Sequence, residues 1–171
     1  MRSGDPILPQ LRESALVHAS SKAGTAHIPV EPKLHLAVVA CMDSRMDIFG
    51  MLGLEVGDAH VLRNAGGVVT DDVIRSLVIS QRVLNTNAIV LIHHTDCGLQ
   101  KITDDEFKHR LESDLGVRPQ WAIEAFRDPF IDVKQSANRL AHSPFIDQEI
   151  DVYGFVYDVD SHALLEVELN D

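Results

Sequence analysis

The sequence has few cysteines and few positive charges for its length. Its 171 residues include two cysteines, and 15 Lys and Arg stand against 26 Asp and Glu, which gives a formal charge of −11. Two cysteines are too few for a disulfide framework. The scarcity of positive charge argues against a nucleic-acid-binding surface, because phosphate backbones need clustered Lys and Arg. We therefore expect a small-molecule ligand and no nucleic-acid partner.

Long hydrophobic runs are also missing. The longest, Leu36 to Met42, is far shorter than the roughly 20 residues that a membrane-spanning helix needs. The N-terminal segment has no apolar stretch of the length that a secretory signal needs. We expect a soluble protein of the reducing cytoplasm, without a membrane partner. In that compartment the two cysteines act as metal ligands, catalytic thiols or buried apolar residues.

The length fits a single domain that spans residues 1–171. An apolar share of 45% is enough to bury a core, but the chain is short for two domains. Four of the seven prolines lie before residue 33 and set off residues 1–33 as an N-terminal arm. Within it, Leu8, Leu11 and Ala15 recur at helical spacing. We expect a short helix whose apolar side is covered by another subunit.

After the arm, strand and helix patterns alternate. Short β-branched apolar runs predict strands at 34–41, 59–62 and 88–92, of the kind that is buried on both faces in a parallel sheet. A helical stripe from 73 to 84 lies between the second and third strands. Strand, helix and strand in this order favour parallel strands joined by crossover connections.

The second half of the sequence continues the pattern. Thr103 opens a T-x-x-E capping box, and Asp128 stands directly before a proline, so each predicts the start of a helix. The segments 152–159 and 163–169 predict a C-terminal hairpin or an extension of the sheet edge. The expected fold class is α/β: a parallel-centred β-sheet flanked by helices, with a C-terminal edge hairpin and an N-terminal helical arm.

Three polar clusters directly follow the three predicted strands. They are residues 41–45 (CMDSR), 63–67 (RNAGG) and 94–98 (HTDCG). In an open α/β sheet, ligands gather beyond the carboxyl ends of the strands. We therefore expect the three clusters to meet at one site.

Two thiols and one imidazole in these clusters form a candidate zinc site. Sulfur and nitrogen donors select zinc, and three protein ligands leave a fourth position for water, as in catalytic zinc sites. His94 and Cys97 lie three residues apart in one predicted loop, and Cys41 would arrive from a neighbouring strand end. Taken alone, Cys41 is equally typical of a small buried residue. A thiol-redox site is a poorer alternative, because the sequence has no C-x-x-C.

Asp43 and Arg45 lie beside the first candidate ligand. As a solvated surface pair they would contribute about 0–1 kcal/mol. Beside a metal, Asp43 is able to accept a hydrogen bond from the metal's water or to bind the metal, and Arg45 is able to hold the carboxylate away from it. Gly66 and Gly67 favour a turn, although paired glycines also let the backbone approach a small pocket.

The motifs C-x-D-x-R, R-N-A-G-G and H-x-x-C-G, in this order, resemble those of the β-class carbonic anhydrases. The similarity runs from about Leu36 to Val167 and is closest to the short members of the class, and it includes the related carbonyl sulfide and carbon disulfide hydrolases. The resemblance implies one zinc ion per chain and the following roles: Cys41, His94 and Cys97 as ligands, Asp43 and Arg45 as the catalytic dyad, and Ala65, Gly66 and Gly98 at the substrate, with the backbone N–H of Gly98 facing it.

The resemblance further implies an activity and an assembly. The activity is the reversible hydration of CO2 to bicarbonate, in which zinc lowers the pKa of water so that it attacks CO2 near neutral pH. The alternative is hydrolysis of carbonyl sulfide or carbon disulfide at the same site. A zinc-storing or redox-sensing dimer without turnover is a non-enzymatic alternative. The implied assembly is a homodimer that is able to pair further into a dimer of dimers.

Two positions depart from the family pattern. Many plant-type members have a glutamine in the arm that helps to hold bicarbonate, but no Gln occurs between Ser21 and Ala40. His60 stands where those members tend to have an aromatic residue. We list His60 as a substrate-site candidate that enlarges or polarises the pocket or relays protons, with a packed structural histidine as the plainer interpretation.

Overall fold

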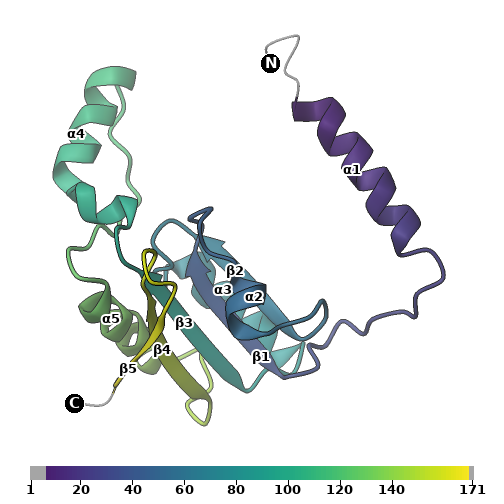
Figure 1. Ribbon diagram of the computed structural model, residues 1–171. Helices are drawn as coiled ribbons and strands as arrows, with labels where there is room; N and C mark the ends of the chain where they lie inside the picture. Colours follow the sequence, from purple (N-terminus) through teal and green to yellow (C-terminus); the bar gives the residue numbers. More distant parts are fainter. Residues whose placement is uncertain (1–6, 170–171) are drawn as a thin grey trace.

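In the computed structural model, which describes residues 7–169, a five-stranded sheet forms the centre of the molecule (Figure 1). The strand order is β2-β1-β3-β4-β5, and the first four strands are parallel while β5 runs antiparallel to β4. This confirms the α/β class with a parallel-centred sheet and a C-terminal edge hairpin. The strands are β1 (Leu36–Cys41), β2 (Ala59–Asn64), β3 (Ala88–His94), β4 (Asp151–Tyr157) and β5 (Leu164–Val167).

The strand ends differ from the sequence prediction by two residues. β1 begins at Leu36 rather than at residue 34, because His35 has a φ of 51° and cannot continue an extended strand. β2 and β3 each run two residues further than predicted, to Asn64 and His94. The apolar pattern stops before these polar residues, but the hydrogen-bonded ladder continues and pairs His94 with Tyr157. His94 is therefore the last residue of a strand and does not lie in a loop.

The three predicted helices of the body are present, two with the predicted caps Thr103 and Asp128 and one with a cap, Thr70, that was not predicted. Thr70, Thr103 and Asp128 each accept a hydrogen bond from a backbone N–H of the first turn, which satisfies a donor that the helix itself cannot pair. Gly116 ends the second helix in the left-handed conformation. The helices are α3 (Asp71–Arg82), α4 (Asp104–Leu115) and α5 (Pro129–Ala141).

Two short helices were not predicted. α2 (Ile48–Leu52) and the 3₁₀ helix η1 (Gly98–Lys101) contain too few residues to show a helical period in the sequence. Each is fixed by its first residues: Asp47 caps α2 through the N–H of Gly50, and Cys97 is the N-cap of η1. These caps lie directly beside two of the polar clusters, so they help to shape the site.

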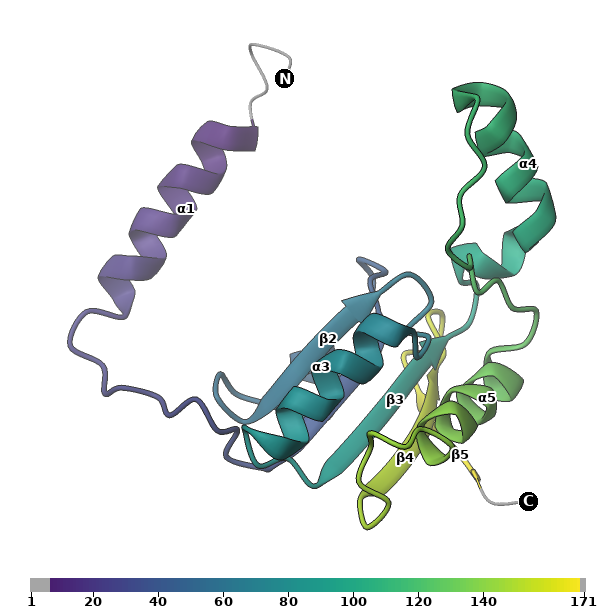
Figure 2. The same cartoon turned by 180° about the vertical axis from the view of Figure 1, so that it is seen from behind.

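The sheet is buried on both faces, which explains the continuous apolar runs of β1 and β3. Val38 faces one core, which α2 and the loop around Phe126 cover, and Val39 faces the other. α3 and α5 cover this second face through Leu77 and Val133 (Figure 2). The cysteines lie in the first core.

The N-terminal arm is helical, as predicted, and it lies apart from the body. α1 (Ile7–Ser21) has no buried residue, and its Leu8 and Leu11 side chains are about half exposed at 51% and 56%. A segment without regular structure connects it to β1, and both views show the helix projecting away from the sheet (Figures 1 and 2). Residues 1–6 of the predicted arm, residues 1–33, lie outside the described residues. Within residues 7–169, no helix combines the length and the apolar character needed to cross a bilayer.

Candidate metal centre

The candidate ligands meet at the carboxyl ends of two adjacent strands. Cys41 ends β1 and His94 ends β3, and the two strands pair directly in the sheet. Cys97 follows at the start of η1 and brings its sulfur to 4.0 Å from that of Cys41. The donor atoms of all three side chains lie within 4.8 Å of one another, and all three residues are buried. The structure thus brings together residues that are 56 positions apart in the sequence.

The imidazole of His94 is oriented by the backbone. Its Nδ1 lies 2.8 Å from the carbonyl oxygen of Thr95, which accepts hydrogen bonds and does not donate them, so Nδ1 carries the proton. Its Nε2 is buried and has no hydrogen-bond partner. A buried nitrogen lone pair beside two sulfur atoms is costly to leave unpaired, and a metal ion satisfies it. The three donors therefore fit a zinc ion.

The pKa values of the two thiols are shifted in opposite directions. The hydrogen bond from Cys97 holds the pKa of Cys41 well below its usual value, and His94 lowers it further. The same hydrogen bond, together with burial, raises the pKa of Cys97. Burial on its own would lower the pKa of His94, but the adjacent Cys41 outweighs it and raises that pKa. The lowered pKa of Cys41 favours its thiolate form, which suits a divalent cation, and binding such an ion would release the remaining thiol proton.

Asp43 and Arg45 form a bidentate pair beside this cluster. The Nε of Arg45 donates to Oδ1 of Asp43 at 2.9 Å, and Nη2 donates to Oδ2 at 2.8 Å. The backbone N–H of Arg45 donates to the same carboxylate at 2.9 Å. These hydrogen bonds hold the pKa of Asp43 well below its ordinary range and raise the pKa of Arg45. Asp43 Oδ2 lies 3.8 Å from Nε2 of His94, so the carboxylate borders the metal site while Arg45 engages it.

The predicted pocket residues differ in how close they lie to the cluster. Gly98 directly follows Cys97, and a Cβ built on it would meet no atom within 4 Å, so the space beside it is open. Ala65 is exposed and lines a cavity of about 530 Å³. Cys41, His94 and Cys97 are not among the residues that line this cavity. Gly66 has no such open space, because a Cβ built on it would lie 2.6 Å from the side chain of Leu99.

His60 does not join the other candidates in this chain. It lies near the amino end of β2, where it pairs with Ala37, whereas the cluster lies at the opposite, carboxyl end of the strands. Its Nδ1 is 2.7 Å from the hydroxyl of Ser80 on α3. The structure therefore places His60 with the second core, as a hydrogen-bonded structural histidine.

Comparison with known proteins decides the family. A family model described as carbonic anhydrase matches residues 36–125, which is more than half of the chain. Beta-carbonic anhydrase 1 of Mycobacterium tuberculosis is 51% identical over 140 residues, which cover 82% of this chain and 86% of that protein. The chain belongs to the β-carbonic anhydrase family.

Two further proteins, one of them named for a different activity, are similar to this chain. The crystal structure of carbonic anhydrase from Streptococcus mutans matches with a TM-score of 0.90 at 44% identity, over 96% of this chain and 99% of that one. Carbon disulfide hydrolase of Acidianus sp. is 34% identical over 154 residues, which cover 75% of each chain. β-Carbonic anhydrases are zinc enzymes, and the Cys-His-Cys cluster of this chain is able to bind that ion.

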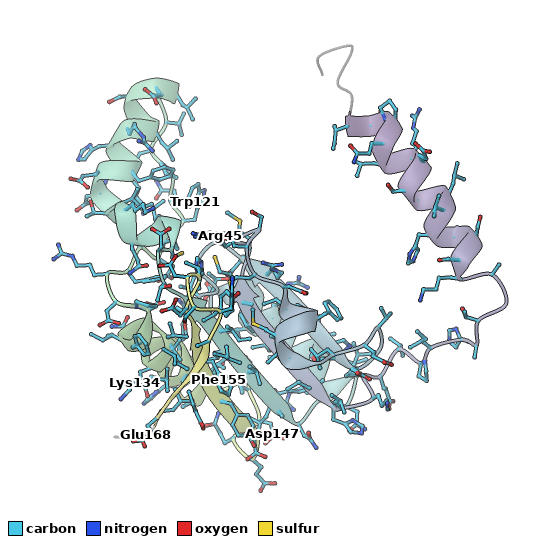
Figure 3. The ribbon with its side chains drawn as sticks, in the orientation of Figure 1. Arg45, Trp121, Lys134, Asp147, Phe155 and Glu168 are labelled. Atoms are coloured by element: carbon cyan, nitrogen blue, oxygen red, sulfur yellow. The ribbon has the colours of Figure 1, made fainter. Side chains whose placement is uncertain are left out.

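Asp96 and Gln100 also contact residues of this β-carbonic anhydrase site. Asp96 accepts from Nη1 of Arg45 at 2.9 Å and pairs with Lys101 at 2.8 Å, so Arg45 is shared between two carboxylates. Figure 3 labels Arg45, which lies at one end of the sheet. Gln100 accepts the backbone N–H of Cys97 at 2.8 Å and thereby orients that ligand's segment. In the sequence, Asp96 stands out because it lies between the two ligands His94 and Cys97, and Gln100 because a Gln three residues after an N-cap is typical of a capping box.

His93, the neighbour of His94, is fully buried and belongs to a different contact. Its Nε2 lies 2.7 Å from Oδ2 of Asp132 on α5, and its ring lies against Phe126. Successive strand residues point to opposite faces of a sheet, so His93 and His94 diverge. His93 therefore links β3 to α5 while His94 faces the cysteines.

Proposed function

We propose that the protein catalyses the reversible hydration of CO2 to bicarbonate. The observation that carries this proposal is the buried Cys41, His94 and Cys97 cluster with an unpaired His94 Nε2, next to a carboxylate fixed by Arg45. The 51% identity to Beta-carbonic anhydrase 1 of M. tuberculosis supports the same assignment.

The three clustered side chains would hold one zinc ion per chain. A bound zinc ion supplies Lewis-acid chemistry, which makes water a nucleophile near neutral pH. Three protein donors leave a fourth position for water, as in other catalytic zinc sites. His94 contributes Nε2, since its Nδ1 is held by the carbonyl of Thr95.

Asp43 acts on the nucleophilic water. Its lowered pKa keeps it an anion, which accepts hydrogen bonds and cannot donate one. Accepting a hydrogen bond from a water molecule at Oδ2, 3.8 Å from His94 Nε2, would turn an oxygen lone pair of that water toward the substrate. Arg45 keeps the carboxylate in this orientation and would thereby keep Asp43 from binding the zinc ion itself.

The surroundings suit a small apolar substrate. The two cysteines lie in a core formed with Val68, Leu99 and Phe126. CO2 carries no charge and is linear, so an apolar wall does not oppose its approach. We propose that Gly98, with open space beside its Cα, and Ala65 border the path of the substrate.

Hydrolysis of carbonyl sulfide or carbon disulfide is the second candidate function. Carbon disulfide hydrolase of Acidianus sp. shares 34% identity with this chain. The lower identity of this relative, set against 51% for Beta-carbonic anhydrase 1, favours CO2 as the substrate.

One assay on a single zinc-loaded sample separates the candidates. Stopped-flow measurement of CO2 hydration runs beside measurement of hydrogen sulfide release from carbonyl sulfide and from carbon disulfide, with Cys41→Ser as the metal-free control. We expect fast CO2 hydration and slow sulfide release. Faster sulfide release than CO2 hydration would establish the hydrolase instead, and zinc binding without any turnover would establish a storage or sensing role.

We propose a homodimer as the working assembly, with a dimer of dimers as the larger form, in the cytoplasm. Isolated helices of about 12–15 residues are marginally stable in water. α1 has 15 residues and none of them is buried, so a second subunit is the natural surface for Leu8, Leu11 and Ala15. β2 also lies at the edge of the sheet, with one side open for pairing. A reducing compartment keeps Cys41 and Cys97 as free thiols able to bind metal.

A further inference from the structure

The R-N-A-G-G motif supplies no donor to the metal cluster, yet Arg63 contacts the segment that carries two of the site's groups. Arg63 is exposed on the edge strand β2. Its Nε donates to the carbonyl oxygen of Cys41 at 2.9 Å, and its Nη2 donates to the carbonyl oxygen of Asp43 at 2.6 Å. One guanidinium thus bridges the backbone on either side of Met42. We call this pair of hydrogen bonds the Arg63 bridge.

The rest of the motif supports the same segment from the backbone. The carbonyl oxygen of Asn64 accepts the N–H of Met42 at 2.7 Å. Gly67 packs directly on the end of β1: a Cβ there would lie 2.8 Å from the backbone nitrogen of Cys41, and its φ of 75° is one that glycine tolerates. The residues from Cys41 to Asp43 are therefore held one after another by the motif on β2 and its turn.

This support matters because β1 ends at Cys41. Beyond that residue, the regular strand ladder no longer fixes the chain, although Asp43 must face the metal site from two residues further on. The carbonyl of Asp43 also accepts the N–H of Met46 at 3.2 Å, which closes a turn but does not connect the turn to the sheet. The Arg63 bridge makes that connection.

We propose that Arg63 is a positioning residue for the reaction: it fixes the backbone of Cys41 and Asp43 so that the sulfur donor and the carboxylate keep their mutual placement. The proposal rests on the proposed function for its kinetic consequence, but its structural part concerns only this segment and the metal. An arginine is required because its planar fork presents two donors in a fixed geometry, whereas lysine presents a single ammonium group. Outer contacts of this kind typically affect metal affinity or activity by about 10- to 100-fold.

The test compares Arg63→Ala, Arg63→Lys and Arg63→Gln with the parent protein. Arg75→Ala is the matched control, because Arg75 is an exposed arginine on α3 that pairs with Asp72. We expect Arg63→Ala to bind zinc about 10-fold or more weakly in chelator competition and to lose about 10- to 100-fold in kcat per bound zinc. Arg63→Lys should have a zinc affinity and a kcat close to those of Arg63→Ala, because charge alone does not form the bridge. Arg63→Gln, with one amide group as donor, should have values between those of Arg63→Ala and the parent protein.

Two readouts separate positioning from general destabilisation. Free guanidinium at low, non-denaturing concentration should restore part of the turnover of Arg63→Ala and none of that of Arg75→Ala. In metal-free protein, the amide of Met42 should exchange faster in Arg63→Ala while the amides of α3 exchange at the parent rate. Parent-like zinc affinity, Met42 exchange and kcat per zinc in Arg63→Ala would overturn the proposal. If the parent itself fails to hydrate CO2, the proposed function fails, and zinc affinity and Met42 exchange still decide the role of Arg63.

Discussion

Arg45 holds the carboxylate of Asp43 through two parallel hydrogen bonds, of 2.9 Å from Nε and 2.8 Å from Nη2. The same guanidinium reaches Asp96 through Nη1, so its orientation is fixed from two sides. The hydrogen bonds from Arg45 hold the pKa of Asp43 well below its ordinary value. Asp43 is therefore an anion throughout the neutral range, and changes of activity near pH 7 must come from other groups.

Replacing Arg45 by alanine tests this pair. Without Arg45 the pKa of Asp43 rises toward the ordinary value of 3.8, which is still far below neutral pH, so the carboxylate stays ionised. We expect zinc to be retained but kcat to fall by about 10- to 100-fold, because the freed carboxylate competes for the metal's open position. Zinc X-ray absorption should then detect a carboxylate oxygen in place of water. Arg45→Lys, which keeps the charge without the fork, serves as the comparison, and loss of zinc from Arg45→Ala would contradict the prediction.

The same pair predicts a pH dependence of stability. Because the folded-state pKa of Asp43 is depressed, its contribution is fully present above the unfolded-state pKa of about 3.9 and is lost as pH falls through the lower, folded-state value. In metal-free protein, the difference in unfolding free energy between the parent and Arg45→Ala should therefore shrink below about pH 4. Urea unfolding of both proteins from pH 3 to pH 7 measures it. If the difference in unfolding free energy stays constant across this range, the ionisation of Asp43 does not contribute to stability through the pair.

Metal content tests the ligand assignment. Cys41→Ser and Cys97→Ser replace soft sulfur donors by hydroxyl groups, which bind zinc poorly. We expect close to one zinc per parent chain by elemental analysis and near-complete loss of both metal and activity in the double variant. His109→Gln, at an exposed histidine on α4, should keep its zinc. Full zinc occupancy in the double serine variant would rule out this site.

The buried contact between His93 and Asp132 is predicted to contribute to stability. Asp132→Ala leaves Nε2 of His93 without its 2.7 Å partner inside the core, at a cost of about 2 kcal/mol. Asp132→Asn keeps a hydrogen-bond acceptor for His93 and should therefore lose less stability than Asp132→Ala. Equilibrium unfolding in urea at pH 7, on metal-free protein, gives both values. Equal stability of the alanine variant and the parent would mean that water replaces the carboxylate at no cost.

Removal of the arm tests the assembly. Deleting the residues before Lys33 removes α1 together with its exposed Leu8 and Leu11. Analytical ultracentrifugation across a dilution series should show a weaker dimer than in the full chain. Leu8→Ser with Leu11→Ser should weaken it in the same direction, whereas Glu13→Gln on the same helix should not. A truncated protein that stays dimeric at high dilution would exclude the arm from the interface.

The sequence by itself determined the elements whose signals are local. Thr103 and Asp128 predicted their helix starts because an N-cap acts within one helical turn. The strand at Leu36–Cys41 could be predicted because burial on both faces requires a continuous apolar run. The three motifs, with Cys41 and His94 at or near strand ends, indicated where a site would form.

Only the tertiary structure decided how these pieces meet. The register of β2 against β1 places His60 beside Ala37, away from the site, and places Arg63 where it reaches the carbonyl oxygens of Cys41 and Asp43. Ladder pairing with β4 carries β3 on to His94 after the apolar pattern has stopped. Pairing between strands depends on backbone hydrogen bonds to residues far away in the chain, so a local pattern cannot reveal which side chains it brings together.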